Sequence, residues 1–213
     1  MLLVGLTGGL ASGKTTVAKF FQQCGAEIID ADQVARAVVK PGKPAWKDLV
    51  KTFGKEILND DRTINRQALA ARVFHEPKRL KRLNQIVHPR VAREQARIAK
   101  EIVRRNPDAV IIYDAALLIE ANAHERMDWV VVVTANQQIQ LARACKRDGF
   151  SRREALARIR GQLPLREKKR VADDLIDGTM PRAQLRRRIQ NLYRELSVKA
   201  RRQTPQSERH ARQ

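Results

Sequence analysis

The chain begins with a short apolar run, a glycine-rich loop and a helical segment, and this order constrains the fold more than any other feature. Leu2 to Leu6 has the unbroken apolar character of a buried parallel strand, and Lys14 to Cys24 has helical apolar spacing. The loop between them contains two glycines separated by four residues, then lysine and a hydroxyl residue, in Gly8-Gly9-Leu10-Ala11-Ser12-Gly13-Lys14-Thr15. Glycines let the main chain turn sharply and aim its N–H groups inward, and the new helix adds its positive end. The pattern therefore predicts a phosphate-binding loop.

Two side chains at the end of this loop have predicted roles. We expect Lys14 to reach the β- and γ-phosphates of a nucleotide and the Thr15 hydroxyl to bind Mg²⁺. The alternative is a glycine-rich turn in which Lys14 is only solvated. The flanking strand and helix favour the phosphate-binding reading over that alternative.

Acidic residues follow two later predicted strands. Ala26 to Ile29 is followed by Asp30 and Asp32, and the strand at 109–112 is followed by Asp114. Ligands bind at the carboxyl ends of strands in open α/β sheets, so we expect these acids at the same edge as the loop. Asp32 is the candidate to accept a proton from a hydroxyl acceptor, whereas Asp30 could be only a helix cap. Asp114 either helps to hold Mg²⁺ through water or is only a helix-cap or turn residue.

Apolar runs at 129–134 and 174–176 complete five predicted strands, which alternate with helices along the chain. The fold class is therefore α/β: a P-loop NTPase-type doubly wound parallel sheet of about five strands, with a helical acceptor-binding insertion and a basic lid. We assign residues 1–39, 106–142 and 171–200 to the nucleotide-binding core and 40–105 to the insertion. The lid is assigned to 143–170, and 201–213 is expected to be a disordered basic tail.

The insertion is predicted to be helical throughout, because no convincing strand interrupts it. Helical segments are expected near 46–53, 66–74, 78–86 and 91–105, and His88-Pro89 is expected to mark the entry to the last of these. A histidine beside proline is more often structural than catalytic. We retain His88 only as a candidate substrate contact.

Charge is concentrated in two places. The net charge is +20, and residues 143–170 hold 11 basic and 3 acidic side chains, as expected for a lid that closes on phosphates. Residues 182–213 hold 10 basic and 2 acidic side chains, and we favour a solvated or weakly anion-binding surface there. Only 4% of residues are aromatic, so stacking platforms for single-stranded nucleic acid are scarce. A nucleic-acid partner is thus not favoured, although the basic tail does not exclude it.

Other features indicate a soluble cytoplasmic protein, and the sequence leaves open whether it is a monomer or a small homo-oligomer. No apolar run approaches the ~20 residues of a membrane span, and the N-terminus enters a strand directly. Cys24 and Cys145 lack metal-ligand spacing and are expected to be reduced.

Several motifs together resemble those of the dephospho-coenzyme A kinase family, over nearly the whole chain to about residue 200. They are the phosphate-loop region 4–18, Asp30-Ala31-Asp32, Arg66 with Leu69 and Val73-Phe74, His88-Pro89, Leu117-Leu118-Ile119-Glu120, Leu141-Ala142-Arg143 with Arg147-Asp148, Gln162-Leu163-Pro164, and Ala172 to Asp177. The resemblance implies an enzyme that uses ATP and Mg²⁺ to phosphorylate the ribose 3′-hydroxyl of dephospho-CoA. It also implies a nucleotide-binding core, a helical CoA-binding domain and a lid.

The same resemblance implies roles for individual residues. Thr7, Asp32 and Arg143 would lie at the reacting centre with Lys14, with Asp32 as the base and Arg143 bridging phosphates. Substrate contacts would come from Asp32, Arg66, His88, Leu117 and Glu120, and metal contacts from Thr15 and Asp114. ATP would be held by Gly9, Leu10, Ala11, Ser12, Gly13, Lys14, Thr15 and Thr16.

Two positions depart from the family pattern, which usually has glycine in place of Ala11 and proline in place of Ala116. Alanine is tolerable at position 11 if its φ is negative, whereas a positive φ would add strain of order 1 kcal/mol. The nearest rival interpretation is another small-molecule or nucleoside kinase with the same loop and lid. A less favoured rival is a basic nucleic-acid-binding ATPase.

Overall fold

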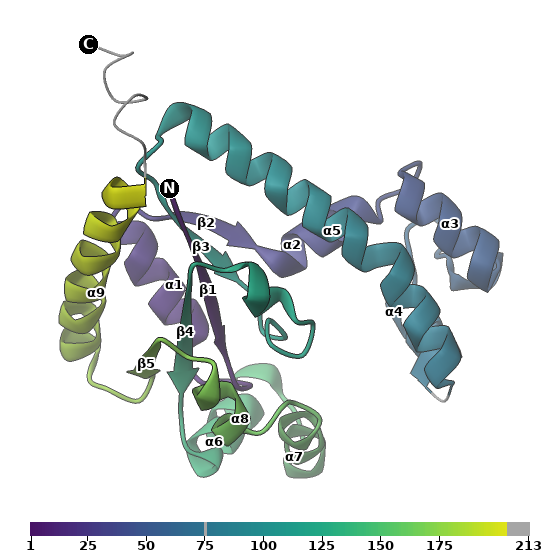
Figure 1. The fold of residues 1–213 in the computed structure, drawn as a ribbon. Helices are drawn as coiled ribbons and strands as arrows, with labels where there is room; N and C mark the ends of the chain where they lie inside the picture. The colour runs from purple at the N-terminus through teal and green to yellow at the C-terminus, as the bar shows by residue number, and fades with distance from the viewer. Residues whose placement is uncertain (75, 204–213) are drawn as a thin grey trace. The chain divides into compact units, whose positions relative to one another are not determined.

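The computed structural model describes residues 1–74 and 76–203 (Figure 1). The chain divides into two compact units, which are described separately. The first contains Met1–Ile29 and the chain from Ile102 onward, and the second is Asp30–Glu101. Whether these units coincide in function with the domains assigned from the sequence stays a prediction.

The first unit is built on a five-stranded parallel sheet with the strand order β2-β3-β1-β4-β5, which confirms the predicted fold class. Its strands are β1 (Leu2–Gly8), β2 (Glu27–Asp30), β3 (Val110–Asp114), β4 (Trp129–Thr134) and β5 (Asp174–Asp177). In the register of the central strands, Leu6 pairs with Asp114 of β3 and with Val131 of β4. The carboxyl ends of β1 and β3 therefore lie side by side, which brings Asp114 next to the start of the glycine-rich loop.

Two helices cover one face of this sheet. α1 (Lys14–Gln23) and α9 (Arg182–Gln203) pack against each other and against β1 and β3 (Figure 1). Alternate residues of the central strands point into the same core, because side chains of a strand alternate between its two faces. This core includes Leu2, Val4, Leu6, Phe20, Phe21, Val110, Ile112, Val131, Val133, Leu185, Ile189 and Leu192.

The remaining helices of this unit lie in the stretch predicted to be a lid and just before it. They are the 3₁₀ helix η2 (Ala123–Arg126), α6 (Gln137–Asp148), α7 (Arg152–Arg160) and α8 (Leu165–Arg170). Ser151 and Glu154 form a reciprocal capping box at the start of α7, which satisfies two helix-end donors. No helix in the described part of the chain combines the length and apolar character needed to cross a bilayer.

The second unit is helical and has its own core. It contains α2 (Ala31–Val38), α3 (Pro44–Phe53), η1 (Lys55–Ile57), α4 (Arg66–Phe74) and most of α5 (Pro77–Arg105). Buried side chains of four of these helices form the core: Ala45, Leu49, Phe53, Ile57, Leu69, Val73 and Ile86. Among the described residues of this unit, the strand-like pairing consists of a single β-bridge between Leu58 and Ile64.

One expectation for this unit was wrong. His88-Pro89 does not begin a helix, because α5 runs without a break from Pro77 to Arg105 with Pro89 inside it. Proline removes the N–H that would bond to the carbonyl of Gln85, at a typical cost of about 3 kcal/mol. His88 and Pro89 lie on an exposed face of α5, so water can reach the Gln85 carbonyl that the proline leaves without a donor. Burial of Ile86, Gln95 and Ala99 on either side favours continuing the helix.

The end of the chain also differs in part from expectation. α9 extends to Gln203, so residues 201–203, which were assigned to the tail, are helical. Residues 204–213, the rest of the predicted disordered tail, lie outside the described residues.

Candidate active site

The phosphate loop (residues 8–15) connects β1 directly to α1. Gly13 adopts φ +100°, a conformation that favours glycine, and its carbonyl accepts from Thr16 N (2.9 Å) and Val17 N (3.2 Å) to start the helix. The Ser12 N–H turns back to the Gly9 carbonyl at 3.1 Å. The amides of Lys14 and Thr15 donate to no backbone carbonyl of the described residues, so this helix end can bind an anion.

Ala11 adopts φ +54°, so the condition under which alanine would be strain-free is not met. A left-handed conformation costs an L-residue with a Cβ about 1–2 kcal/mol. Ala11 and Leu10 pack against the apolar cluster of Leu141, Ala144 and Ala155, and this contact offsets part of the strain.

The Lys14 ammonium forms an ion pair with the Asp114 carboxylate at the end of β3. Their side chains are only 19% and 14% exposed, so the pair is partly shielded from solvent. Thr15, the other predicted metal contact, is exposed in the first turn of α1.

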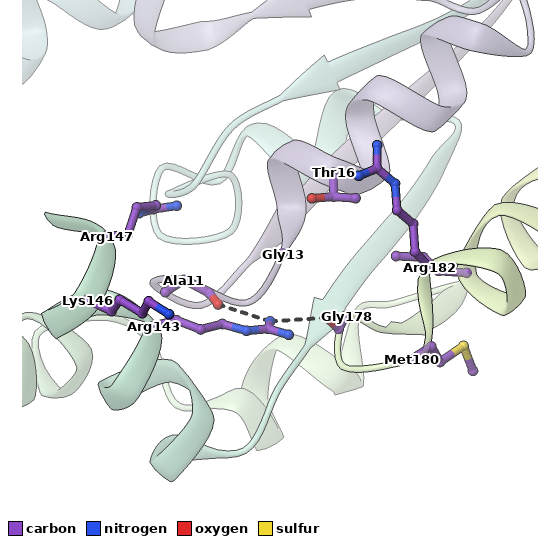
Figure 2. Close-up of a pocket in the computed structure, with 10 residues that line it drawn as sticks. Ala11, Gly13, Thr16, Arg143, Lys146, Arg147, Gly178, Met180 and Arg182 are labelled. Carbon is purple, nitrogen blue, oxygen red and sulfur yellow. Dashed lines mark hydrogen bonds between the residues drawn. The ribbon is translucent and has the colours of Figure 1, made fainter.

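The loop after β5 packs tightly on the phosphate loop (Figure 2). A Cβ built on Gly178 would lie 1.9 Å from the Ser12 carbonyl oxygen, so only glycine fits at this distance. Arg143 of α6 joins the two loops, because its Nη1 donates to the carbonyl oxygens of Gly178 (3.1 Å) and Ala11 (3.4 Å).

A cavity of about 630 Å³ opens beside this junction. Gly13 and Thr16 line it from the phosphate loop and α1, and Met180 lines it from the loop after β5 (Figure 2). Its basic lining side chains are Arg143, Lys146, Arg147 and Arg182. The arrangement can hold a polyanion whose uncharged part enters the cavity.

The segment predicted to be a lid contacts the loop from another direction. Gln162, between α7 and α8, accepts a hydrogen bond from the Leu10 N–H at 2.7 Å through its Oε1. Gln140 of α6, which precedes that segment, fills the space over Gly9, since a Cβ on that glycine would lie 2.6 Å from the Gln140 side-chain nitrogen.

A buried lysine holds the same segment to the chain after β3. Lys168 of α8 is 1% exposed, and its Nζ lies 2.8 Å from Glu120 and 3.3 Å from the Ala116 carbonyl oxygen. Glu120 also accepts from the Leu163 N–H at 3.0 Å. Burial raises the pKa of the Glu120 carboxyl, but the Lys168 ammonium and two backbone N–H groups outweigh it, and the pKa lies below its ordinary value. The Thr7 hydroxyl donates to the same Ala116 carbonyl at 3.1 Å.

Sequence relationships decide the family. A sequence profile described as Dephospho-CoA kinase matches residues 2–189 of this chain. The chain belongs to the dephospho-CoA kinase family. A dephospho-CoA kinase of Geobacter metallireducens is 45% identical over 196 residues, which cover 92% of this chain and 96% of that protein.

Solved structures share the fold of this chain. TT1252 from Thermus thermophilus has 30% identity and a TM-score of 0.78, covering 92% of this chain and 97% of its own. A dephospho-CoA kinase from Campylobacter jejuni shares the fold at 24% identity, with a TM-score of 0.61 and the same coverage. The resemblance found in the sequence is confirmed.

Within this dephospho-CoA kinase family member, the predicted site residues fall into two groups. Thr7, Lys14, Asp114, Arg143 and the rest of the phosphate loop belong to the first unit, where the contacts above bring them together. Leu117 and Glu120 belong to it as well, but Glu120 is bonded to Lys168 and Leu117 is 54% exposed.

The second group consists of Asp32, Arg66 and His88, which all belong to the second unit and are exposed. Asp30 caps α2, as the alternative interpretation had it, by accepting from Asp32 N (2.8 Å) and Gln33 N (3.0 Å). Asp32 makes no side-chain hydrogen bond or ion pair with any residue that the structure describes.

Sequence reasoning missed three features of the site: Gly178, Met180 and Lys168. Gly178 lies just after the last predicted strand, but no role in the site was predicted for it. The position of Gly178 could have indicated its role, because the carboxyl end of β5 lies at the same sheet edge as the phosphate loop. Nothing in the local sequence marks Lys168, one of several basic residues in α8, as a buried one.

Proposed function

We propose that this chain transfers the γ-phosphoryl group of ATP to the ribose 3′-hydroxyl of dephospho-CoA, giving coenzyme A and ADP. The observation that carries the proposal is the phosphate loop, with Lys14 beside it and a basic cavity of about 630 Å³ adjoining it, in a member of the dephospho-CoA kinase family. This reaction would complete the synthesis of coenzyme A.

ATP binds with its phosphates on the loop amides of residues 9–16 and its nucleoside in the adjoining cavity. The cavity volume lies within the ~300–1,000 Å³ typical of small-molecule sites. Lys14 contacts the β- and γ-phosphates, and Arg143, already held at the loop by two carbonyls, bridges phosphate oxygens.

The residues present fit a Mg²⁺ ion held mainly by phosphates and water. The first unit supplies the Thr15 hydroxyl and the Asp114 carboxylate, and the described residues contain no cluster of three or more His, Cys, Asp or Glu that could form a protein cage. Bound there, Mg²⁺ would neutralise charge on the transferred phosphate. Thr15 and Asp114 are the residues that would hold the ion.

Asp32 accepts the proton of the 3′-hydroxyl as that oxygen attacks the γ-phosphorus. Its carboxylate is exposed at the start of α2 and is not engaged by another described side chain, so it can bond to an acceptor. Arg66 and His88, exposed on the same unit, contact dephospho-CoA. Lys14 and Arg143 neutralise the charge that develops on the phosphoryl oxygens.

ADP release with different acceptors tests the proposal. Dephospho-CoA should support turnover far better than adenosine or nucleoside monophosphates, and the product should carry its new phosphate on the 3′-oxygen. Preference for a nucleoside monophosphate would instead identify a nucleotide kinase. Lys14→Ala should weaken ATP binding and abolish turnover.

A matched pair of variants tests the base. Asp32→Asn should lower kcat by about 10²–10⁴-fold with ATP affinity nearly unchanged. Asp30→Asn is the control, because asparagine caps helices as well as aspartate does and should leave kcat within twofold. Equal losses in both variants would remove Asp32 from the mechanism.

A further inference from the structure

The second unit contains a basic cavity whose lining includes none of Asp32, Arg66 and His88. It has a volume of about 500 Å³ and lies among the end of α2, the start of α3 and the middle of α5. Ala37, Val38, Pro44 and Ala45 give it an apolar floor. Its charged lining side chains are Lys40, Lys43, Arg90, Arg93, Glu94 and Arg97.

Two of the five cations are already compensated. Arg90 pairs with Asp48 and donates to the Ile86 carbonyl at 2.7 Å, so it serves the packing of α5 on α3. Arg97 pairs with Glu94 and Glu101. These contacts neutralise both guanidinium groups.

The other three cations have no close ion-pair partner among the described residues, although Lys43 interacts electrostatically with Glu94. Lys40, Lys43 and Arg93 form no ion pair with any residue in 1–74 or 76–203. The cavity has five cations against the three carboxylates of Asp48, Glu94 and Glu101, which leaves an excess of two positive charges. A ligand with two or more negative charges would balance it.

The start of α3 adds donors on the same side. Its N-cap residue, Lys43, offers no side-chain cap, and Ala45 lines the cavity. The amides of Ala45 and Trp46 donate to no backbone carbonyl of the described residues, so the positive end of this ten-residue helix supplements the three cations.

The cavity lies away from the residues predicted to contact the acceptor. Successive helical residues are rotated by about 100°, so Ala37 and Val38 point about 140° and about 120° away from Asp32 around α2. By the same count, the four α5 residues that line the cavity point about 120–180° away from His88. Both helices thus present the cavity on faces other than those that carry Asp32 and His88.

We propose that this cavity binds a small organic phosphate, a phosphate ester with at least two negative charges and an apolar portion, separately from ATP and dephospho-CoA. Lys40, Lys43 and Arg93 hold the phosphate, and the floor formed by the ends of α2 and α3 accepts the apolar portion. The site goes beyond the kinase activity, and binding can be measured without turnover.

Inorganic pyrophosphate is a suitable probe, titrated calorimetrically into the full chain in metal-free buffer with the nucleotide site saturated by ADP. Wild-type protein should bind one equivalent. The double variant Lys43→Gln/Arg93→Gln should bind at least tenfold more weakly. The control Lys51→Gln/Lys55→Gln removes two positive charges from exposed positions outside the cavity and should change affinity less than twofold.

Steady-state kinetics complete the test. Both double variants should keep kcat and both KM values within twofold, which also shows that they fold. No binding by wild-type protein, or equal loss in the two variants, would overturn the proposal. A raised KM for dephospho-CoA only in the cavity variant would show that the acceptor itself occupies the cavity, and would overturn it as well.

Discussion

Gly178→Ala tests how the nucleotide site is held together. In the structure, a Cβ at this position would lie 1.9 Å from the Ser12 carbonyl oxygen and 2.9 Å from Val133 Cγ1. Ordinary contact begins near 3.4 Å, so the Ser12 carbonyl would have to withdraw by about 1.5 Å, which is 3.4 minus 1.9. Gly178 does not have a positive φ, so the effect is steric and not a matter of backbone strain.

The displacement should affect both stability and catalysis. Overpacking of this kind costs about 1–3 kcal/mol of unfolding free energy. Ser12 precedes the amides that bind phosphate, and a shift of more than 1 Å breaks a hydrogen bond whose optimum is near 2.9 Å. Misplacement on this scale can lower catalytic efficiency by about 10²-fold. We expect the loss mainly in kcat/KM for ATP.

Gly161→Ala is the matched control. Gly161 ends α7 with φ −74° and ψ −8°, and its added Cβ would lie 3.4 Å from the Ala157 carbonyl oxygen, an ordinary contact. This variant should be neutral or more stable by up to about 1 kcal/mol. Urea denaturation and ADP release at varied ATP concentration measure both effects. Wild-type stability and an unchanged KM for ATP in Gly178→Ala would refute the packing argument.

Three further predictions concern the loop and its supports. Glu120→Gln should lower the free energy of unfolding, measured by urea denaturation, by about 3–5 kcal/mol, because it leaves the Lys168 ammonium buried without a counter-charge. Lys168→Met should lower it less, because the Glu120 side chain is 21% exposed and still reaches solvent; equal losses in the two variants would argue against this difference. The pKa of Glu120 is lower in the folded state than its ordinary value of 4.5, so the carboxylate stabilises the fold above pH 4.5 and this stabilisation disappears as the pH falls through the folded pKa. The difference in unfolding free energy between wild type and Glu120→Gln should therefore narrow on acidification. A difference that stays constant from pH 7 to pH 3 would contradict this. Ala11→Gly should change the unfolding free energy by less than about 1 kcal/mol, whereas Ala11→Val, β-branched at φ +54°, should destabilise the chain measurably.

The sequence was sufficient for the sheet and the phosphate loop because their signals are local. The apolar run at Trp129–Thr134 predicts a covered strand, and the glycine and lysine spacing predicts the loop without reference to any distant residue. The alternation of strands and helices then leaves few topologies open. These features account for the confirmed fold class.

What the sequence did not predict depends on contacts between distant positions. Ser12 and Gly178 are 166 positions apart, and no local pattern says that their backbones approach closely. The same holds for Lys168 and Glu120, whose burial follows from the packing of α8. Pro89 is the opposite case, since its strong local preference to break a helix yields to the packing of the residues around it.

Ala11 shows how these distant contacts sustain a local departure from the family pattern. Its left-handed conformation costs about 1–2 kcal/mol, but glycine there would cost about 0.5–1 kcal/mol in chain entropy and would lose a methyl group packed on Leu141, Ala144 and Ala155. Burying a methyl group contributes up to about 0.8 kcal/mol, so the opposing effects nearly cancel. The Arg143 hydrogen bond to the Ala11 carbonyl also fixes the backbone that a glycine would loosen. Alanine is therefore tolerated in the loop because α6 and α7 support it.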